Sequence, residues 1–173
     1  MAGTGGAATG LLFGKPMSKI PLTVSGAAKL RSELQRLKTV DRPAAIAAIG
    51  EARLHGDISE NAEYDAARDK QGLMEARIRD IESKLGNAQV VDPKTLQAEG
   101  RVVFGATVEV EEESGDAATW QIVGEDEADI KEGRISFGSP IARALIGKLA
   151  GDSVEVQTPG GLKRYEIVDV RYQ

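Results

Sequence analysis

The chain has 173 residues and a net charge of −5, with 4% aromatic residues, no cysteine and a single histidine. This composition excludes disulfides, thiolate or multi-histidine zinc sites and a cysteine nucleophile, and the acidic charge argues against a general nucleic-acid binder. No apolar run approaches the roughly 20 residues that cross a bilayer, so we expect a cytoplasmic protein without a membrane partner.

The charge is unevenly distributed along the chain, which favours two domains over one. Residues 17–92 contain 12 Lys and Arg against 12 Asp and Glu, whereas residues 93–173 contain 9 against 15. Residues 1–16 are rich in Gly and Ala and lack a basic start, so we expect a leader or flexible extension there and not a signal peptide. We therefore predict a helical hairpin over residues 17–90 and a globular domain over residues 91–173.

The segment from Ser25 to about Leu54 has helical periodicity. Its apolar residues recur at intervals of three and four, as Leu30, Leu34, Leu37, and again as Ala45, Ile49, Ala52. Ser25 is a candidate N-cap. Pro43 interrupts the pattern and is expected to bend the helix or break it locally.

A second helical segment has the clearer pattern, an unbroken alternation of four- and three-residue steps. The residues on this seam are Glu60, Tyr64, Ala67, Gln71, Met74, Ile78, Ile81, Leu85 and Ala88. Such a seam is typical of a coiled coil, and Gly86 offers a C-terminal stop. Two such segments joined by a short turn predict an antiparallel hairpin about 40 Å long, with residues 55–60 at its tip.

Beyond the hairpin the apolar period becomes two, which indicates strands. The expected strands are residues 101–113, 118–124, 134–138, 152–159 and 162–172. One helix over residues 139–148, with Ser139 as its N-cap and Pro140 in its first turn, completes a small α+β domain. The acidic runs 109–116 and 124–129 are expected to be solvated loops and edge strands, with an acidic surface for a basic partner as the alternative.

Two carboxylates at the predicted tip, Asp57 and Glu60, have two interpretations. Their spacing is that of a capping box, in which Asp57 accepts from a backbone amide and Glu60 reaches back. Alternatively, they form part of a Mg²⁺ shell, because this ion keeps several waters and is usually held by only one or two protein carboxylates. Two carboxylates cannot complete such a site, so the remaining ligands would belong to another molecule.

The residues around this pair leave similar alternatives open. Arg53 and Arg68 could hold phosphate oxygens or pair with acidic neighbours such as Glu63 along the helix. Tyr64 could stack on a base or fill the hairpin near its tip. His55 is expected to be an exposed turn residue, because nothing beside it forms a triad, and no other catalytic constellation occurs in the sequence.

Three stretches in this order resemble the motifs of one family. They are TVSGAAKLRSEL (Thr23–Leu34), GDISENAEYDAAR (Gly56–Arg68) and SFGSPIARALIGKLAGD (Ser136–Asp152). The chain resembles bacterial transcript cleavage factors of the Gre family, most closely the GreA type, from about residue 17 to residue 173. The resemblance implies an N-terminal antiparallel coiled coil followed by an FKBP-like globular domain.

The resemblance also implies a function. The globular domain of such factors docks on RNA polymerase at the rim of the secondary channel, and the coiled coil passes down the channel to the active site. The protein is then not an enzyme by itself. It stimulates the polymerase to cleave the 3′ end of backtracked nascent RNA, which rescues arrested complexes, and we expect it to act as a monomer.

Site residues follow from the same resemblance. Asp57 and Glu60 become the catalytic pair, which shares the second active-site Mg²⁺ with the polymerase, and the isolated protein is expected to bind no metal tightly. The supporting tip residues are Asn61, Glu63 and Tyr64, and the candidates for RNA contact are Arg53 and Arg68. The segment matching the polymerase-docking face is Ser139, Pro140 and Ile141.

Two alternatives compete with this function. A regulator of the same shape would enter the channel and inhibit the polymerase, but the presence of both Asp57 and Glu60 favours the cleavage factor. An FKBP-like isomerase or chaperone would need an aromatic-lined pocket. The five aromatic residues after residue 92 are instead needed largely for the core, so we expect no isomerase activity.

Overall fold

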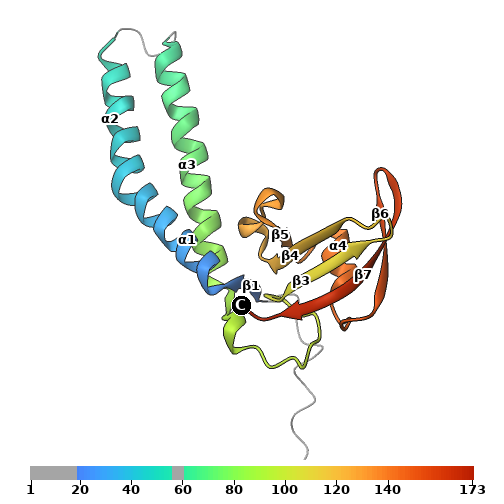
Figure 1. The fold of residues 1–173 in the computed structure, drawn as a ribbon. Coiled ribbons are helices and arrows are strands. Elements are labelled where there is room, and N and C mark those ends of the chain that lie inside the picture. The colour runs from blue at the N-terminus through green and yellow to red at the C-terminus, as the bar shows by residue number, and fades with distance from the viewer. Residues whose placement is uncertain (1–18, 56–60) are drawn as a thin grey trace, which may run out of the picture.

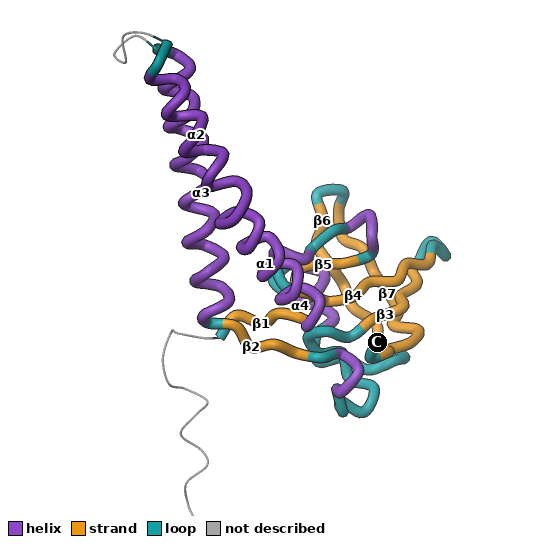
Figure 2. The backbone as a smooth tube through the Cα atoms, turned by 90° about the vertical axis from the view of Figure 1, so that its left-hand side faces the viewer, coloured by secondary structure: helices purple, strands orange, loops and turns teal. Residues whose placement is uncertain are grey.

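The computed structural model describes residues 19–55 and 61–173 and places them in a helical rod and a β-rich domain (Figure 1). The rod is an antiparallel hairpin of two helical arms, and the domain is a curled five-stranded sheet with one short α-helix. Figure 2 shows that the rod projects well beyond the sheet. The predicted fold class, a helical hairpin followed by a small β-rich domain, is confirmed.

The first arm runs from α1 (Val24–Arg36) through a π-helical turn (Leu37–Asp41) into α2 (Arg42–Arg53). The π turn ends two residues before Pro43, which occupies the first turn of α2. Proline has no backbone N–H to donate, and a wider turn accommodates both that loss and the slip in apolar spacing. The arm therefore continues past Pro43 with a local irregularity.

The second arm is α3 (Ala62–Gly86), which ends at the predicted glycine. Ile78 and Ile81 on its predicted seam are buried. The other seam residues that the structure describes are half-buried: Tyr64, Ala67, Gln71, Met74, Leu85 and Ala88. The seam is thus the packing face of the hairpin. Among the helices of the described ranges, none is both long and apolar enough to cross a membrane.

Ion pairs join the two arms along the rod. Arg42 donates from Nε and Nη2 to the two carboxylate oxygens of Glu75, each at 2.8 Å. Arg77 makes the same two-point contact with Glu33, at 2.8 and 2.9 Å. The hydrogen bond from Arg42 holds the pKa of Glu75 below its ordinary value. Partly exposed pairs of this kind add little net stability, but their paired geometry specifies how the arms align.

Two short strands at the base of the rod were not predicted. β1 (Ile20–Thr23) and β2 (Ala88–Val91) pair in parallel, just before the first arm and just after the second. Each has only four residues, which is too short for a recognisable alternation in the sequence. These strands form because the hairpin brings its own two ends together.

The first helix begins earlier than predicted, directly after β1. Thr23, the last residue of β1, is the N-cap of α1, and its hydroxyl accepts a hydrogen bond from the Gly26 amide at 3.1 Å. The predicted cap, Ser25, is therefore wrong, and Ser25 lies inside the first turn. Both residues carry a capping hydroxyl, and the extended backbone of Thr23 decides between them.

The sheet has the strand order β5-β4-β3-β7-β6, with antiparallel neighbours except for β4 and β5. Its strands are β3 (Thr107–Glu112), β4 (Ala117–Val123), β5 (Arg134–Ser136), β6 (Ser153–Thr158) and β7 (Gly161–Arg171). Each overlaps one predicted strand. Helix α4 (Pro140–Leu145) follows β5 and packs beside β6.

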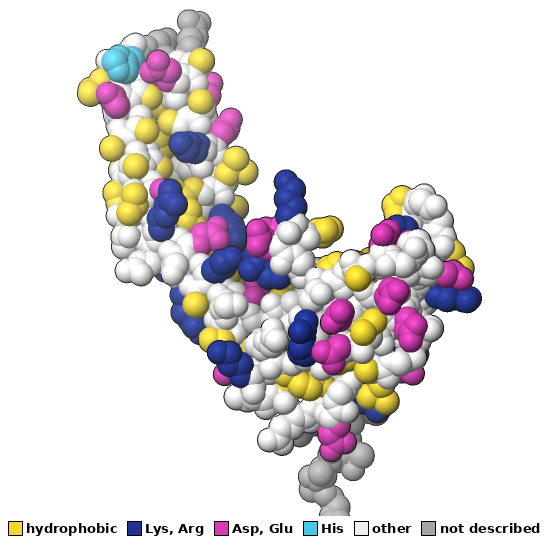
Figure 3. Space-filling model, in the orientation of Figure 1, with side chains coloured by type: hydrophobic (Ala, Val, Ile, Leu, Met, Phe, Trp, Pro, Cys, Tyr) yellow, Lys and Arg dark blue, Asp and Glu magenta, His cyan; other side chains and the backbone are white. Residues whose placement is uncertain are grey.

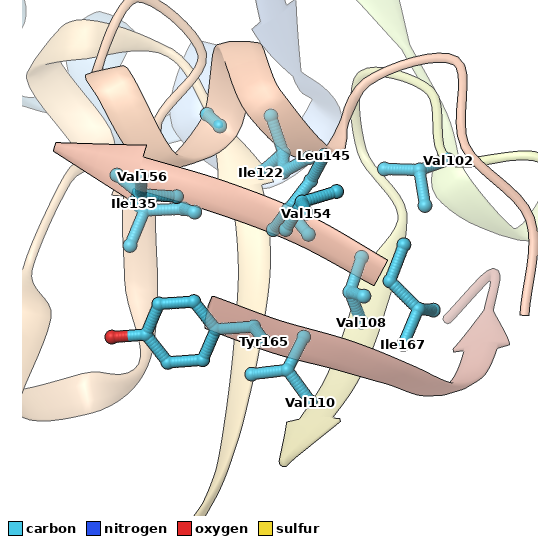
Figure 4. Packing of buried hydrophobic residues seen from close by; sticks show 11 residues of the cluster. Val102, Val108, Val110, Ile122, Ile135, Leu145, Val154, Val156, Tyr165 and Ile167 are labelled. Atoms are coloured by element: carbon cyan, nitrogen blue, oxygen red, sulfur yellow. The ribbon is translucent and has the colours of Figure 1, made fainter. Parts of the chain in front are cut away.

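One face of the sheet is buried against α4, and its apolar side chains form the core of the domain (Figure 4). The alternating residues Val108 and Val110 of β3 and Tyr165 and Ile167 of β7 point into this core. Aromatic rings pack against it in two edge-to-face pairs, Phe104–Phe137 at 5.9 Å and Trp120–Tyr165 at 5.4 Å between centroids. These four rings are engaged in packing.

Candidate functional site at the hairpin tip

The end of the rod farthest from the sheet is where α2 ends and α3 begins (Figure 1). The predicted carboxylate pair, Asp57 and Glu60, lies outside the described residues. The chain on both sides of that segment is described, up to His55 and from Asn61. In Figure 3 the single histidine and acidic side chains lie at this end of the rod.

Asn61 fastens the two arms together at the tip. Its side-chain oxygen accepts a hydrogen bond from the Tyr64 amide at 3.1 Å, which makes it the N-cap of α3. Its side-chain nitrogen donates to the backbone carbonyl of Ala52, which is buried in the last turn of α2. The first turn of α3 is thereby attached to the last turn of α2.

Helix α3 begins at Ala62 with Asn61 as its N-cap, and the predicted capping box of Asp57 and Glu60 lies outside the described residues. Several residues of this stretch have side chains that favour a helix start. The cross-arm bond to Ala52 selects Asn61, and a contact of that kind leaves no signature in local spacing. Asn61 therefore both starts α3 and joins it to α2.

Tyr64 fills the hairpin near its tip, as one of the two alternatives expected. Its ring is half-buried between the arms, and the Arg53 guanidinium carbon lies 5.7 Å from the ring centroid. This cation–π contact holds Arg53 along the end of α2. Glu63 and Arg68 have exposed side chains on α3, and Glu63 lies in the first turn, where the helix dipole favours a negative charge.

A shallow hollow between the arms opens beside the tip. It is lined by Ala48, Glu51, Ala52, His55, Glu63 and Ala67. Over residues 19–55 and 61–173, no three His, Asp or Glu side chains come close enough to hold a metal ion.

We expect Asn61→Ala to lower the free energy of unfolding by about 1 kcal/mol, because the variant loses the cap of α3. The Tyr64 amide loses its acceptor, so its hydrogen exchange should become several-fold faster, and the bond from Asn61 to Ala52 is lost as well. Asn61→Asp keeps the capping oxygen and removes only the donor to Ala52. Native-state hydrogen exchange should therefore show near-normal protection at Tyr64 in the Asp variant, and equal loss in both variants would contradict the assigned cap.

The predicted docking segment lies on the β domain at the start of α4. Ser139 is the N-cap, its hydroxyl donating to the Ser136 carbonyl at 2.7 Å and accepting from the Ala142 amide at 3.3 Å. Pro140 is exposed, and Ile141 packs against the core cluster. The segment is thus fixed from within the domain while Pro140 faces outward.

The junction between rod and β domain contains residues whose role the sequence analysis missed. Within the acidic run 124–129, Glu125–Glu127 form a short 3₁₀ turn beside the rod, and the expectation of a solvated loop is wrong for Glu127. Asp126 lies 2.9 Å from Lys84 Nζ and 3.5 Å from an Arg77 nitrogen, both on α3. Glu127 is buried and bonded to Thr23. Hydrogen bonding to Glu33 holds the pKa of Arg77 above its ordinary value, with Asp126 adding to the effect.

The fold defines a two-part protein, in which a helical rod with acidic residues at its far end stands on a compact β domain. Family models agree with this division. "Transcription elongation factor, N-terminal" matches residues 20–90, and "Transcription elongation factor, GreA/GreB, C-term" matches residues 97–172. The chain belongs to the GreA/GreB family of transcription elongation factors.

Full-length relatives carry the same family name. The transcription elongation factors GreA of Alkalilimnicola ehrlichii and of Thioalkalivibrio sulfidiphilus are each 66% identical over 157 residues, covering 90% of this chain and 99% of theirs. A solved structure, the elongation factor GreA/GreB from Nitrosomonas europaea, is 26% identical with a TM-score of 0.39, covering 89% of this chain and all of that one.

Proposed function

We propose that the protein binds RNA polymerase and stimulates the polymerase's own Mg²⁺-dependent cleavage of the 3′ end of backtracked RNA. The observation that carries the proposal is a helical rod of about 40 Å that stands on a separate β domain and has exposed carboxylates such as Glu63 at its free end. This arrangement suits delivery of ligands into a narrow channel from a docking point outside it. The protein acts in the cytoplasm, as a monomer.

The protein and the polymerase would share the ligands of one Mg²⁺ ion, because two carboxylates provide only part of its coordination shell. When Mg²⁺ is bound at the polymerase active site, it activates the water that attacks the RNA phosphodiester. Asp57 and Glu60 are the residues that would help to hold this ion and orient its water, through their carboxylate oxygens. The polymerase and the RNA phosphates provide the other ligands, so the isolated protein is neither an enzyme nor a tight metal binder.

The remaining residues orient the tip and its substrate. Asn61 and Tyr64 join the arms, which keeps the two carboxylates at the end of a single rigid element. Arg53 and Arg68 offer exposed guanidinium groups to the RNA phosphates, and Glu63 supports the charge of the tip. On the β domain, the docking segment Ser139, Pro140 and Ile141 meets the polymerase.

The test uses the cognate RNA polymerase stalled on a template with its RNA labelled at the 3′ end. Adding the protein should release short labelled fragments and allow the shortened RNA to be extended. Labelled RNA without polymerase should stay intact, because the protein does not cleave alone. Slower RNA synthesis with no fragment release would instead identify a channel inhibitor, and this proposal would be wrong.

A further inference from the structure

A single carboxylate of the β domain is buried against the start of the rod. Glu127 is 8% exposed and follows β4 in a short 3₁₀ turn (Glu125–Glu127). It accepts hydrogen bonds from both the backbone amide of Thr23, at 3.1 Å, and the Thr23 hydroxyl, although 104 residues separate the two in sequence. The Gly124 amide of its own turn also donates to it, at 3.1 Å.

Thr23 connects this carboxylate to the first helix. The Thr23 hydroxyl accepts from the Gly26 amide and donates to Glu127, so one hydroxyl serves both as the cap of α1 and as a tertiary contact. The N-terminus of α1 has unsatisfied amides and the positive end of the helix dipole, which favour a negative charge at that place. Glu127 provides this charge from the other part of the molecule.

Gly26 leaves the space that Glu127 occupies. A Cβ atom on Gly26 would lie 2.0 Å from the Glu127 carboxyl carbon and 2.3 Å from its Oε1. Such distances are far below van der Waals contact, so a side chain on residue 26 and the carboxylate cannot both stay in place. The glycine is needed here for close approach and not for an unusual backbone angle. Thr23 and Gly26 of the TVSG stretch thus form a socket for Glu127.

The neighbouring Asp126 contacts the other arm of the rod. Its carboxylate lies against Lys84 and Arg77 of α3, while Glu127 holds the start of α1. A single contact would leave the rod free to pivot about it. Contacts to two different helices fix its direction relative to the sheet. In Figure 3 positive and negative side chains gather where the base of the rod meets the domain.

We infer that Glu127, seated in the Thr23–Gly26 socket, is a positioning residue that sets the direction of the rod relative to the docking domain. This inference rests on the proposed function, because direction matters only if the tip must reach a fixed target. Without the contact, the free protein would occupy several rod directions, and only a fraction would be competent to enter the channel. The apparent affinity falls in proportion to that fraction.

The first experiment needs no polymerase. Because the chain has no cysteine, spin labels can be placed at Ala76→Cys on α3 and Gln157→Cys on β6, two exposed positions. We expect one narrow distance distribution in the otherwise native protein and in Glu125→Ala, which changes an exposed carboxylate of the same turn. Glu127→Ala and Gly26→Ala should each broaden the distribution. An unchanged distribution in Glu127→Ala would overturn the inference.

A double substitution separates the socket from a general loss of folding. If Gly26 matters only because Glu127 fills its space, Gly26→Ala adds no further broadening in the Glu127→Ala background. Independent destabilisation would instead make the two effects add. Thr23→Ser, which keeps both donors to Glu127, should retain the native distribution. Loss of the native distance in that variant would contradict the assigned contacts.

Cleavage assays then connect the geometry to function. For Glu127→Ala we expect the half-saturating protein concentration to rise about tenfold, with a maximal cleavage rate within twofold of the native value, because the inserted complex is the same. If the maximal cleavage rate instead falls about tenfold while the half-saturating protein concentration stays unchanged, the positioning role is overturned. If the native protein releases no RNA fragments at all, the proposed function fails, while the label distances still report whether Glu127 holds the rod.

Discussion

Asp57→Asn and Glu60→Gln are each expected to reduce the stimulated RNA cleavage rate by about 100-fold or more, with polymerase binding retained. Each change keeps the shape of the side chain and removes its negative charge. A carboxylate that helps to hold a catalytic ion acts mainly in the transition state, and losing about 3 kcal/mol of such stabilisation corresponds to this factor. Fragment release from stalled polymerase, measured at saturating protein, gives the rate directly.

The controls distinguish chemistry from folding. Asp65→Asn changes an exposed carboxylate in the first turn of α3 and should leave the rate within about twofold of native. Each tip variant should also compete with the native protein for the polymerase, since the β domain and the rod are unchanged. If Asp57→Asn and Glu60→Gln cleave like the native protein, the carboxylates are not catalytic. A loss of rate that merely follows earlier thermal unfolding would lead to the same conclusion.

The rod could be predicted from sequence because its packing is local and repetitive. Seam residues such as Ile78 and Ile81 recur at the spacing of one helix face, and each meets the opposite arm in turn. The strands of the β domain were recognisable for the same reason, since Val108 and Val110 alternate with polar residues. Periodic burial leaves a periodic pattern in the sequence.

The junction could not be predicted, because its contacts join residues far apart in sequence. Glu127 lies in a run of acidic residues whose composition is typical of a solvated loop, and its partner Thr23 belongs to a strand of four residues. The Thr-x-x-Gly spacing was visible in the sequence, but nothing local indicates that a carboxylate fills the space above Gly26. The N-cap of α3 depends on a similar contact, because Asn61 also donates to the Ala52 carbonyl of the other arm.

Ile81→Ala is expected to lower the free energy of unfolding by about 3 kcal/mol. The side chain is fully buried at the base of the rod, in a cluster with Leu22, Ala27 and Leu30. Deleting its outer carbons removes apolar burial and leaves a cavity between α1 and α3, for which Ile→Ala changes typically cost about 2–5 kcal/mol. Urea unfolding followed by circular dichroism at 222 nm measures the loss in the rod.

Leu73→Ala provides the matched control, because Leu73 lies on the same helix but is 75% exposed. Both variants place alanine in α3, so helix propensity contributes little to the difference, and the exposed site should change stability by less than about 0.5 kcal/mol. The single tryptophan, Trp120, reports unfolding of the β domain separately. We expect the 222 nm transition of Ile81→Ala to move to lower urea more than the Trp120 transition. Similar losses in both variants would mean that burial against Leu22, Ala27 and Leu30 is not what stabilises the base of the rod.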